Sequence, residues 1–529
     1  MASSLRWNRH KWGFRLLIWV GLAVVLFFLT AIFLAKVTIP PRFSVVVVGI
    51  LVVGVPAALY FIRGVSYEKA VVVMVMTLPL LYGFVIEFGG NFRVPYFFAV
   101  LAFGLGLLQG KLRALPITPT TVLLAAFVMY AVFSTALTFG IDTSGPREAV
   151  GFRLSTLRSV IQAGQLILMV MGLYVTINYI TSFERLNRFS NLVFWSTAAL
   201  CLYGAYDFVT ALFGLHFYSI IYDLSYYAGG IDSPYFSFGD VSIPRPRSTL
   251  GEPSNFADFL LFGIPFTIAS LSLEKSTVLR IVKVGIVFLG CMLFVVANSR
   301  AALLAIPVIF IAVLWLAPSK IYRLRMLLAL GVIYLLIAFV IFPMAGGEAD
   351  ALSPVHYYKE RMASLTNIGA NLRAEPEGAS IGRGYSTPLG IFKDHPIWGV
   401  GLGNYPFYYT EFVGSDIIVL GSPFSLYFRL LTELGIVGTS LFLLFVATML
   451  WRLLRFIISM PRDSINLRLR PFALAALIAI IGVMIARVGL DGLCTDSYIW
   501  VMLGVGVVIP WLAKRSPAVA KLVHPLATD

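Results

Sequence analysis

Uninterrupted apolar runs of about 20 residues recur along this chain and constrain its fold more than any other feature. A helix of that length crosses the hydrocarbon core of a bilayer, whereas a membrane barrel is built from short segments of alternating hydrophobicity. Only 12% of the 529 residues are charged, against about 25% in a soluble domain. We therefore predict an all-α fold, a polytopic helical integral membrane protein.

We expect about 12–14 transmembrane helices. The lower number applies if a hairpin containing one of the short runs, 94–110 or 301–317, does not cross the membrane. The first run is too long for the core of a signal peptide, so we interpret it as a retained helix. The candidate spans are residues 13–35, 43–62, 70–87, 94–110, 121–139, 160–180, 189–213, 255–273, 279–297, 301–317, 326–345, 424–450, 471–489 and 498–513.

The formal net charge of +15 reflects membrane topology, and we expect no nucleic-acid partner. Lys and Arg concentrate in alternate short connections, which lie on the cytoplasmic side of a membrane together with both termini. The longer connections 140–159, 214–254 and 346–423 then fall on the opposite face, where long loops are often functional. The three cysteines have no spacing typical of disulfides or metal ligands, and we expect neither a metal nor another cofactor.

The stretch from Arg245 to Arg300 concentrates the residues that we expect to bind an anion. Arg245 and Arg247 precede the span that begins near residue 255, and Arg300 returns to the same face in a very short turn. Arginine occurs at such a membrane edge when an anion or a local partner neutralises it, and its planar fork suits phosphate. Snorkelling is the alternative for Arg300.

The start of the same span offers further polar groups. Ser254 or Asn255 could cap the helix and leave its first N–H groups facing the anion. For Arg247, pairing with Glu252 or with lipid headgroups is an equal alternative to substrate binding. Asp258 follows one turn later at the same membrane edge.

The longest loop ends in H-P-I-W-G-V-G-L-G-N-Y, residues 395–405. The segment lacks the strand–loop–helix context of a nucleotide-binding loop, so we predict a glycine-rich bend that re-enters a cavity at the membrane edge. His395 is a candidate general base, although a surface histidine is the more common role for it and for His356.

The last spans carry charges at helical spacing. Arg429 and Glu433 are four residues apart, which predicts a local ion pair, and Arg487 and Asp491 repeat that spacing. With Asp496 nearby, these charges suggest a polar cavity that opens outward.

Several of these motifs together resemble the bacterial O-antigen ligase and O-antigen polymerase superfamily. Their order and spacing fit across roughly residues 240–440. The matching pieces are R-P-R-S-T-L-G-E-P-S (245–254), N-S-R-A-A (298–302), R-G-Y-S-T-P-L-G-I-F-K-D-H-P-I-W-G-V-G-L-G-N-Y (383–405) and L-Y-F-R-L-L-T-E-L-G-I-V-G (426–438).

The resemblance implies an inverting, metal-independent glycosyltransferase on the periplasmic face of the bacterial inner membrane, with a glycan on undecaprenyl diphosphate as donor. Arg245 and Arg300 would engage the diphosphate, with Arg383 as a third basic position. Fixed cations of this kind stabilise charge on the leaving group. The base is His395, His356 or Glu252, or the cations suffice alone. We expect substrate contacts from Arg247, Asp258, Arg383 and Arg429.

The resemblance also separates two activities. Ligases of the family often carry a histidine just before the L-Y pair, where this chain has Phe424 and Ser425. In addition, the E-P-S-x-F-A motif at 252–257 is more similar to the sequences of repeat-unit polymerases. We therefore favour a polymerase that makes exopolysaccharide, capsule or O-antigen over a ligase that transfers finished glycan to lipid A core or another acceptor. Expected partners are the lipid-linked donor, the acceptor glycan, membrane lipid, a chain-length regulator and a flippase.

Two readings from other classes fit less well. A transporter or flippase favours charges near the midplane and broken helices in matched halves, and a purely structural protein does not explain why Arg245 and Arg300 converge. We divide the chain into N-terminal transmembrane helices (1–213), a ligase/polymerase-like core (214–450) that includes the periplasmic loop 346–423, and C-terminal transmembrane helices with a cytoplasmic tail (451–529).

Overall fold

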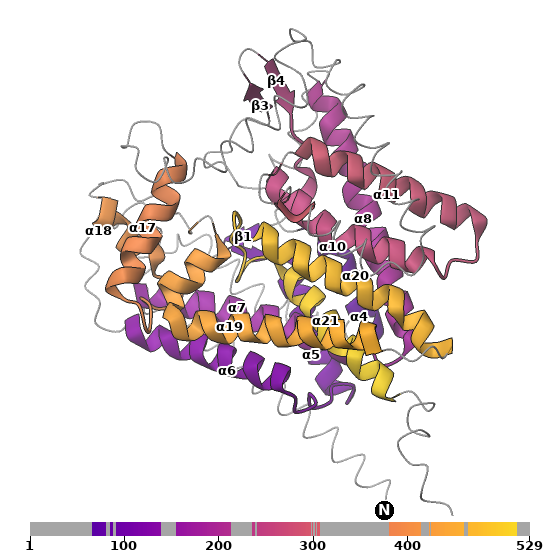
Figure 1. Ribbon diagram of the computed structural model, residues 1–529, viewed down its shortest axis with the longest axis horizontal. Coiled ribbons are helices and arrows are strands. Elements are labelled where there is room, and N and C mark those ends of the chain that lie inside the picture. The colour runs from indigo at the N-terminus through magenta and orange to yellow at the C-terminus, as the bar shows by residue number, and fades with distance from the viewer. Residues whose placement is uncertain are drawn as a thin grey trace, which may run out of the picture.

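The computed structural model shows a bundle of packed helices (Figure 1). It describes residues 66–80, 85–87, 91–138, 155–212, 235–238, 241–297, 299, 302, 304–306, 380–413, 423, 425–459 and 464–515. The predicted spans 13–35, 43–62 and 326–345 and most of 301–317 lie outside these residues.

The described helices are α4 (Tyr67–Met76), α5 (Val94–Leu108), α6 (Pro119–Phe133), α7 (Ser155–Tyr179), α8 (Phe183–Leu212), α10 (Pro253–Leu271), α11 (Thr277–Ala297), α17 (Ser380–Asp394), α18 (Tyr405–Val413), α19 (Leu426–Ser459), α20 (Ser464–Ala486) and α21 (Ser497–Arg515). Most of the described helices correspond to predicted spans, whereas α17 and α18 lie in the predicted long loop 346–423. Among the described helices, 7 are long and apolar enough to cross a membrane: α6 with the following 3₁₀ turn, α7, α8, α10, α11, α19 and α20. The predicted helical, multi-pass membrane protein is confirmed.

One predicted span is wrong. The run 70–87 was expected to form a single membrane helix, but α4 ends at Met76 and a short strand occupies Val85–Glu87. Pro79 accounts for the difference, because proline disfavours helical geometry at the residue before it and cannot donate the next helical hydrogen bond.

Two small antiparallel hairpins add strand to the helical fold. β1 (Val85–Glu87) pairs with β2 (Asn91–Arg93), and β3 (Tyr235–Phe238) pairs with β4 (Val241–Pro244). The second hairpin belongs to the long connection before α10, and it delivers the chain directly to Arg245.

Helices α10 and α20 form the centre of the bundle. In each of these two helices, 72% of the residues in the most apolar stretch are buried inside the protein, compared with 28% in α11 and 33% in α19. Helix α10 packs against α8, α11 and α20, while α20 also contacts α19 and α21. On the far side of α20 from α10, α19 runs alongside α6 (Figure 1). The centre of the bundle is therefore where the segment that starts at Arg245 meets the C-terminal spans.

Candidate functional site

The chain enters α10 through a short polar turn. A 3₁₀ turn, η4 (Ser248–Leu250), precedes Glu252, which occupies the N-cap position with extended backbone angles, and Pro253 is the first helical residue. The expectation that Ser254 or Asn255 caps α10 is therefore wrong, because proline favours the first helical position and fixes the start two residues earlier. The Ser254 hydroxyl donates to Glu252 Oε2 at 3.2 Å, and Glu252 is exposed.

Arg245 joins this entrance to the end of α11. Its Nε donates to the backbone carbonyl of Ala297 at 3.0 Å, and Ala297 is the last residue of α11. A cation beside a helix C-terminus also interacts favourably with the free carbonyls there. Arg300 follows Ala297 by three positions. The placement of Arg300 itself lies outside the described residues.

Arg247 is held by a residue that the sequence analysis did not single out. The backbone N–H groups of Arg247 and Ser248 both donate to Asp207 Oδ2, at 2.8 and 3.1 Å. Ser248 has a positive φ of 52°, an uncommon geometry that these hydrogen bonds stabilise. The signal was present, since Asp207 is an acidic residue within an apolar span, where such residues need a partner.

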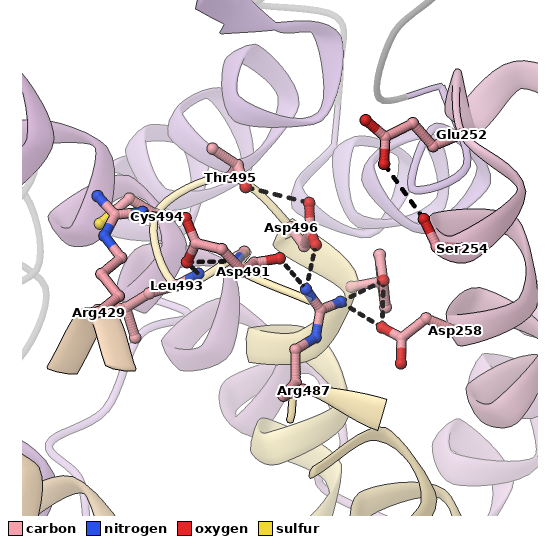
Figure 2. A network of polar contacts seen from close by, with 12 residues as sticks. Glu252, Ser254, Asp258, Arg429, Arg487, Asp491, Leu493, Cys494, Thr495 and Asp496 are labelled. Atoms are coloured by element: carbon pink, nitrogen blue, oxygen red, sulfur yellow. Dashed lines mark hydrogen bonds and ion pairs between the residues drawn. The ribbon is translucent and has the colours of Figure 1, made fainter. Parts of the chain in front are cut away.

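A buried polar network fixes α10 to the C-terminal helices (Figure 2). The Arg487 guanidinium donates to Asp258 Oδ2, to Asp496 Oδ2 at 2.7 Å and to the Tyr498 hydroxyl at 2.6 Å. The Tyr498 hydroxyl in turn donates to Asp258. Asp258, which we expected to contact substrate, therefore has its partners within the protein.

The second arginine–carboxylate spacing does not produce the expected pair. Arg487 Nη1 donates to the backbone carbonyl of Asp491, while the Asp491 carboxylate accepts from Arg429 Nη1 at 2.7 Å. Helix α20 ends at Ala486, so residues 487–496 form a turn to which the spacing rule of a helix does not apply.

This turn is closely packed around Gly492. A Cβ atom at Gly492 would lie 2.1 Å from Asp496 Oδ2 and 2.2 Å from Arg487 Nη1. In the same turn, burial raises the pKa of the Cys494 thiol to about 12, which keeps it protonated. Cys494 therefore lacks the thiolate that a nucleophile or a metal ligand requires.

Arg429 connects α19 to two further elements. It donates to Glu433 Oε2 at 3.0 Å, which is the local pair that the spacing predicts, to Asp491 Oδ2 at 2.7 Å, and to Gln162 Oε1 of α7 at 2.7 Å. Arg429 and Glu433 are both buried. The two arginine-centred networks therefore meet in the turn between α20 and α21.

The glycine-rich segment docks where α19 is broken. Gly435 has φ 60° and ψ −166°, which interrupts α19. The N–H groups of Val400 and Gly401 donate to the carbonyls of Thr432 and Glu433, both at 2.9 Å, and the N–H of Ile436 donates to the carbonyl of Pro396 at 2.9 Å. The segment thus takes up backbone groups that the interrupted helix leaves without internal partners.

Side chains of α6 and α7 hold this segment from the other side. The Tyr130 hydroxyl lies 3.1 Å from the carbonyls of both Trp398 and Leu434. The Ser159 hydroxyl donates to Asn404 Oδ1 at 3.1 Å, and Asn404 is fully buried. The predicted glycine-rich bend is thus a fixed part of the bundle.

The remaining predicted site residues lie on α17 and beside it. His395 directly follows α17 and is exposed, and its ring packs edge-on against Tyr408 of α18 with centroids 5.5 Å apart. Arg383 lies on α17, and its side chain is outside the described part. Within the described ranges, no group of three or more His, Cys, Asp or Glu side chains is arranged to hold a metal ion.

The helical bundle and its buried charged networks define a multi-pass membrane protein with a polar site at one end. Residues 285–443, less than a third of the chain, match the family described as O-Antigen ligase. Over these residues, the match confirms the resemblance to the O-antigen ligase and polymerase superfamily. No curated protein shows significant similarity to it.

The matched segment contains part of the site only. Arg300, Arg383, His395 and Arg429 lie inside it, whereas Arg245, Arg247, Glu252 and Asp258 precede it. Arg487 and its C-terminal partners follow it. The structure joins the parts, since Arg429 contacts Asp491 and Arg487 contacts Asp258.

Proposed function

We propose that this protein is a glycan polymerase that acts on the periplasmic face of the bacterial inner membrane. It transfers a growing chain from undecaprenyl diphosphate to the next lipid-linked repeat unit. The observation that carries the proposal is the hydrogen bond from Arg245 to Ala297, because Ala297 precedes the other candidate diphosphate ligand, Arg300, by only three positions in the sequence.

In the proposed reaction, a hydroxyl oxygen of the acceptor sugar attacks the anomeric carbon of the donor. The bond between that carbon and the diphosphate oxygen breaks with inversion, and the diphosphate leaves with the electron pair. Arg245 and Arg300 would stabilise the charge on the leaving group, as fixed cations do when they are positioned before the reaction. The donor is activated already, so no metal or further cofactor is required by the balance of the reaction.

Glu252 is our candidate for the base that accepts the proton of the acceptor hydroxyl. It is exposed at the start of α10, seven positions from Arg245, and its carboxylate accepts a hydrogen bond from Ser254. His395 is the alternative base. It directly follows α17, and its ring packs against Tyr408 of α18. A base must come within hydrogen-bond reach of the reacting hydroxyl, so the position of Glu252 on the Arg245 segment supports the first choice.

A ligase is the second candidate, favoured by the description of the matching family. Purified protein in lipid, supplied only with an undecaprenyl-diphosphate-linked repeat unit, separates the two. A ladder of products on a gel supports the polymerase. Product that forms only after lipid A core or another acceptor is added supports the ligase, and no product in either reaction would direct attention to transport.

A further inference from the structure

Arg158, in the first turns of α7, is a cation whose hydrogen-bonding capacity the described residues do not fill. Its Nε is buried and has no hydrogen-bond partner among them, while the side chain as a whole is half-buried. An arginine that is removed from water without partners destabilises a membrane protein, and such residues typically mark a pathway or a binding site. Arg158 therefore has donors available to a ligand.

The neighbours of Arg158 belong to the site already described. The charged groups that act on it are Glu433, Arg429 and Asp491. Gln162, one turn further along α7, accepts from Arg429, and a Cβ atom at Gly403 would lie 2.7 Å from Gln162 Cγ and 3.5 Å from the Arg158 carbonyl. Arg158 thus lies where α7, α19, the glycine-rich segment and the 487–496 turn come together.

Arg429 already occupies the nearby carboxylates. It is within 3.0 Å of Glu433 and 2.7 Å of Asp491, and its third contact is Gln162. By contrast, the hydrogen bonds among the described residues leave Nε of Arg158 unused. The two arginines are therefore not equivalent: one organises the site, and the other is open to a ligand.

Charge counting indicates which ligand fits. Arg158 and Arg429 carry two positive charges, and Glu433 and Asp491 carry two negative charges, so the four side chains sum to zero. A second diphosphate would bring uncompensated negative charge into this cluster, which is costly at a membrane edge. A sugar is neutral and rich in hydroxyl groups, which accept hydrogen bonds from a guanidinium and donate them to carboxylates.

We propose that Arg158 is the ligand-binding residue of a carbohydrate subsite, in which its guanidinium donates hydrogen bonds to hydroxyl groups of the acceptor glycan. The inference rests on the proposed function for the identity of the glycan. It separates the two substrates in space, since the lipid diphosphate of the donor is assigned to Arg245 and Arg300 and the sugar of the acceptor to the end of α7.

Binding measurements with full-length protein in lipid nanodiscs test this assignment. One probe is the oligosaccharide released by mild acid from the lipid-linked repeat unit, and the other is undecaprenyl diphosphate without sugar. Arg158→Ala should weaken binding of the oligosaccharide by about tenfold to a hundredfold, the effect of losing hydrogen bonds to a charged group. It should leave binding of undecaprenyl diphosphate unchanged.

Matched variants complete the design. Arg245→Ala should weaken binding of undecaprenyl diphosphate and leave binding of the oligosaccharide unchanged. Arg455 is an exposed arginine at the other end of α19, and Arg455→Ala should change neither affinity. If Arg158→Ala does not fold, Arg158→Lys keeps the charge but lacks the planar fork, and it should still weaken oligosaccharide binding. In the polymerisation reaction, the variant should raise KM for the acceptor more than it lowers kcat.

The inference is overturned if wild type and Arg158 variants bind the oligosaccharide equally, if wild type does not bind it, or if the variants lose undecaprenyl diphosphate instead. These results are distinguishable from failure of the proposed function. Wild-type protein that binds the oligosaccharide through Arg158 but produces no ladder would retain the subsite and remove the polymerase. A product ladder from wild type, together with an unchanged KM for the acceptor in Arg158→Ala, would retain the polymerase and remove the subsite.

Discussion

Asp258, near the start of α10, and Arg487, directly after α20, form an ion pair in which neither side chain has solvent-exposed surface. They lie 229 positions apart in the sequence. Asp496 contacts the same guanidinium (Figure 2), and so does the hydroxyl of Tyr498. The pair therefore fixes the helix that follows Arg245 relative to the turn that contacts Arg429.

Arg487→Ala should destabilise the protein strongly, by about 3–5 kcal/mol, because it leaves two buried carboxylates without their cation. Asp258→Asn should cost less, since one carboxylate, that of Asp496, still neutralises Arg487. Thermal unfolding of detergent-solubilised protein, monitored by size-exclusion chromatography, ranks the stabilities of the two variants. Arg455→Ala is the control for loss of an exposed arginine, and equal stability of Arg487→Ala and this control would contradict the role of the pair.

Gly435→Ala should release the glycine-rich segment from α19. Its Cβ would lie 2.2 Å from the Ile397 carbonyl oxygen, and its φ of 60° is unfavourable for alanine. We expect faster proteolysis near residues 396–401 and loss of product. Gly285→Ala in α11 is the matched control, because a Cβ there meets nothing within 4 Å and alanine favours the helix by about 1 kcal/mol. If residues 396–401 of Gly435→Ala resist proteolysis as they do in wild type, the contact with α19 at Gly435 does not hold the glycine-rich segment in place.

Arg245→Ala and Arg300→Ala should each abolish product while the amount of protein in the membrane stays normal. The reason is loss of charge stabilisation on the leaving diphosphate, which typically changes rates by about a hundredfold to a thousandfold for a single donor. Product on gels and protein on immunoblots provide the two readouts. Wild-type product in either variant would exclude the proposed diphosphate site.

Cysteine labelling tests the predicted sidedness. In a background with the three native cysteines replaced, Ile397→Cys should react with a membrane-impermeant maleimide in intact spheroplasts, since Ile397 is exposed beside α17. Lys275→Cys, in the exposed connection between α10 and α11, should react only after the membrane is permeabilised. The reverse pattern would invert the topology and place the site in the cytoplasm.

Span positions were predictable because the membrane imposes one strong requirement, a long apolar helix with its backbone satisfied internally. The predicted run 255–273 corresponds to α10 at Pro253–Leu271, and 279–297 corresponds to α11 at Thr277–Ala297. The short α4 shows the limit, because hydrophobicity continues past Pro79 although the helix does not.

Side-chain partners were predictable only where local spacing decides them. The pair of Arg429 and Glu433 follows from one turn of helix, whereas Arg487 selects Asp258 across the bundle. The break at Gly435 was equally hidden, since a glycine in an apolar run gives no sign that another segment will supply its hydrogen bonds. Arg158 lies at the end of a loop with other charges, and only the packed structure distinguishes it.

The docking of residues 396–401 on residues 432–437 fixes both ends of the intervening chain, which is therefore a closed loop. Lengthening such a loop adds only a slowly growing entropic penalty, about 0.6 kcal/mol for each doubling of its length. A change in the length of the chain between α18 and α19 should therefore cost little folding free energy, and Arg429 would stay in register with α7.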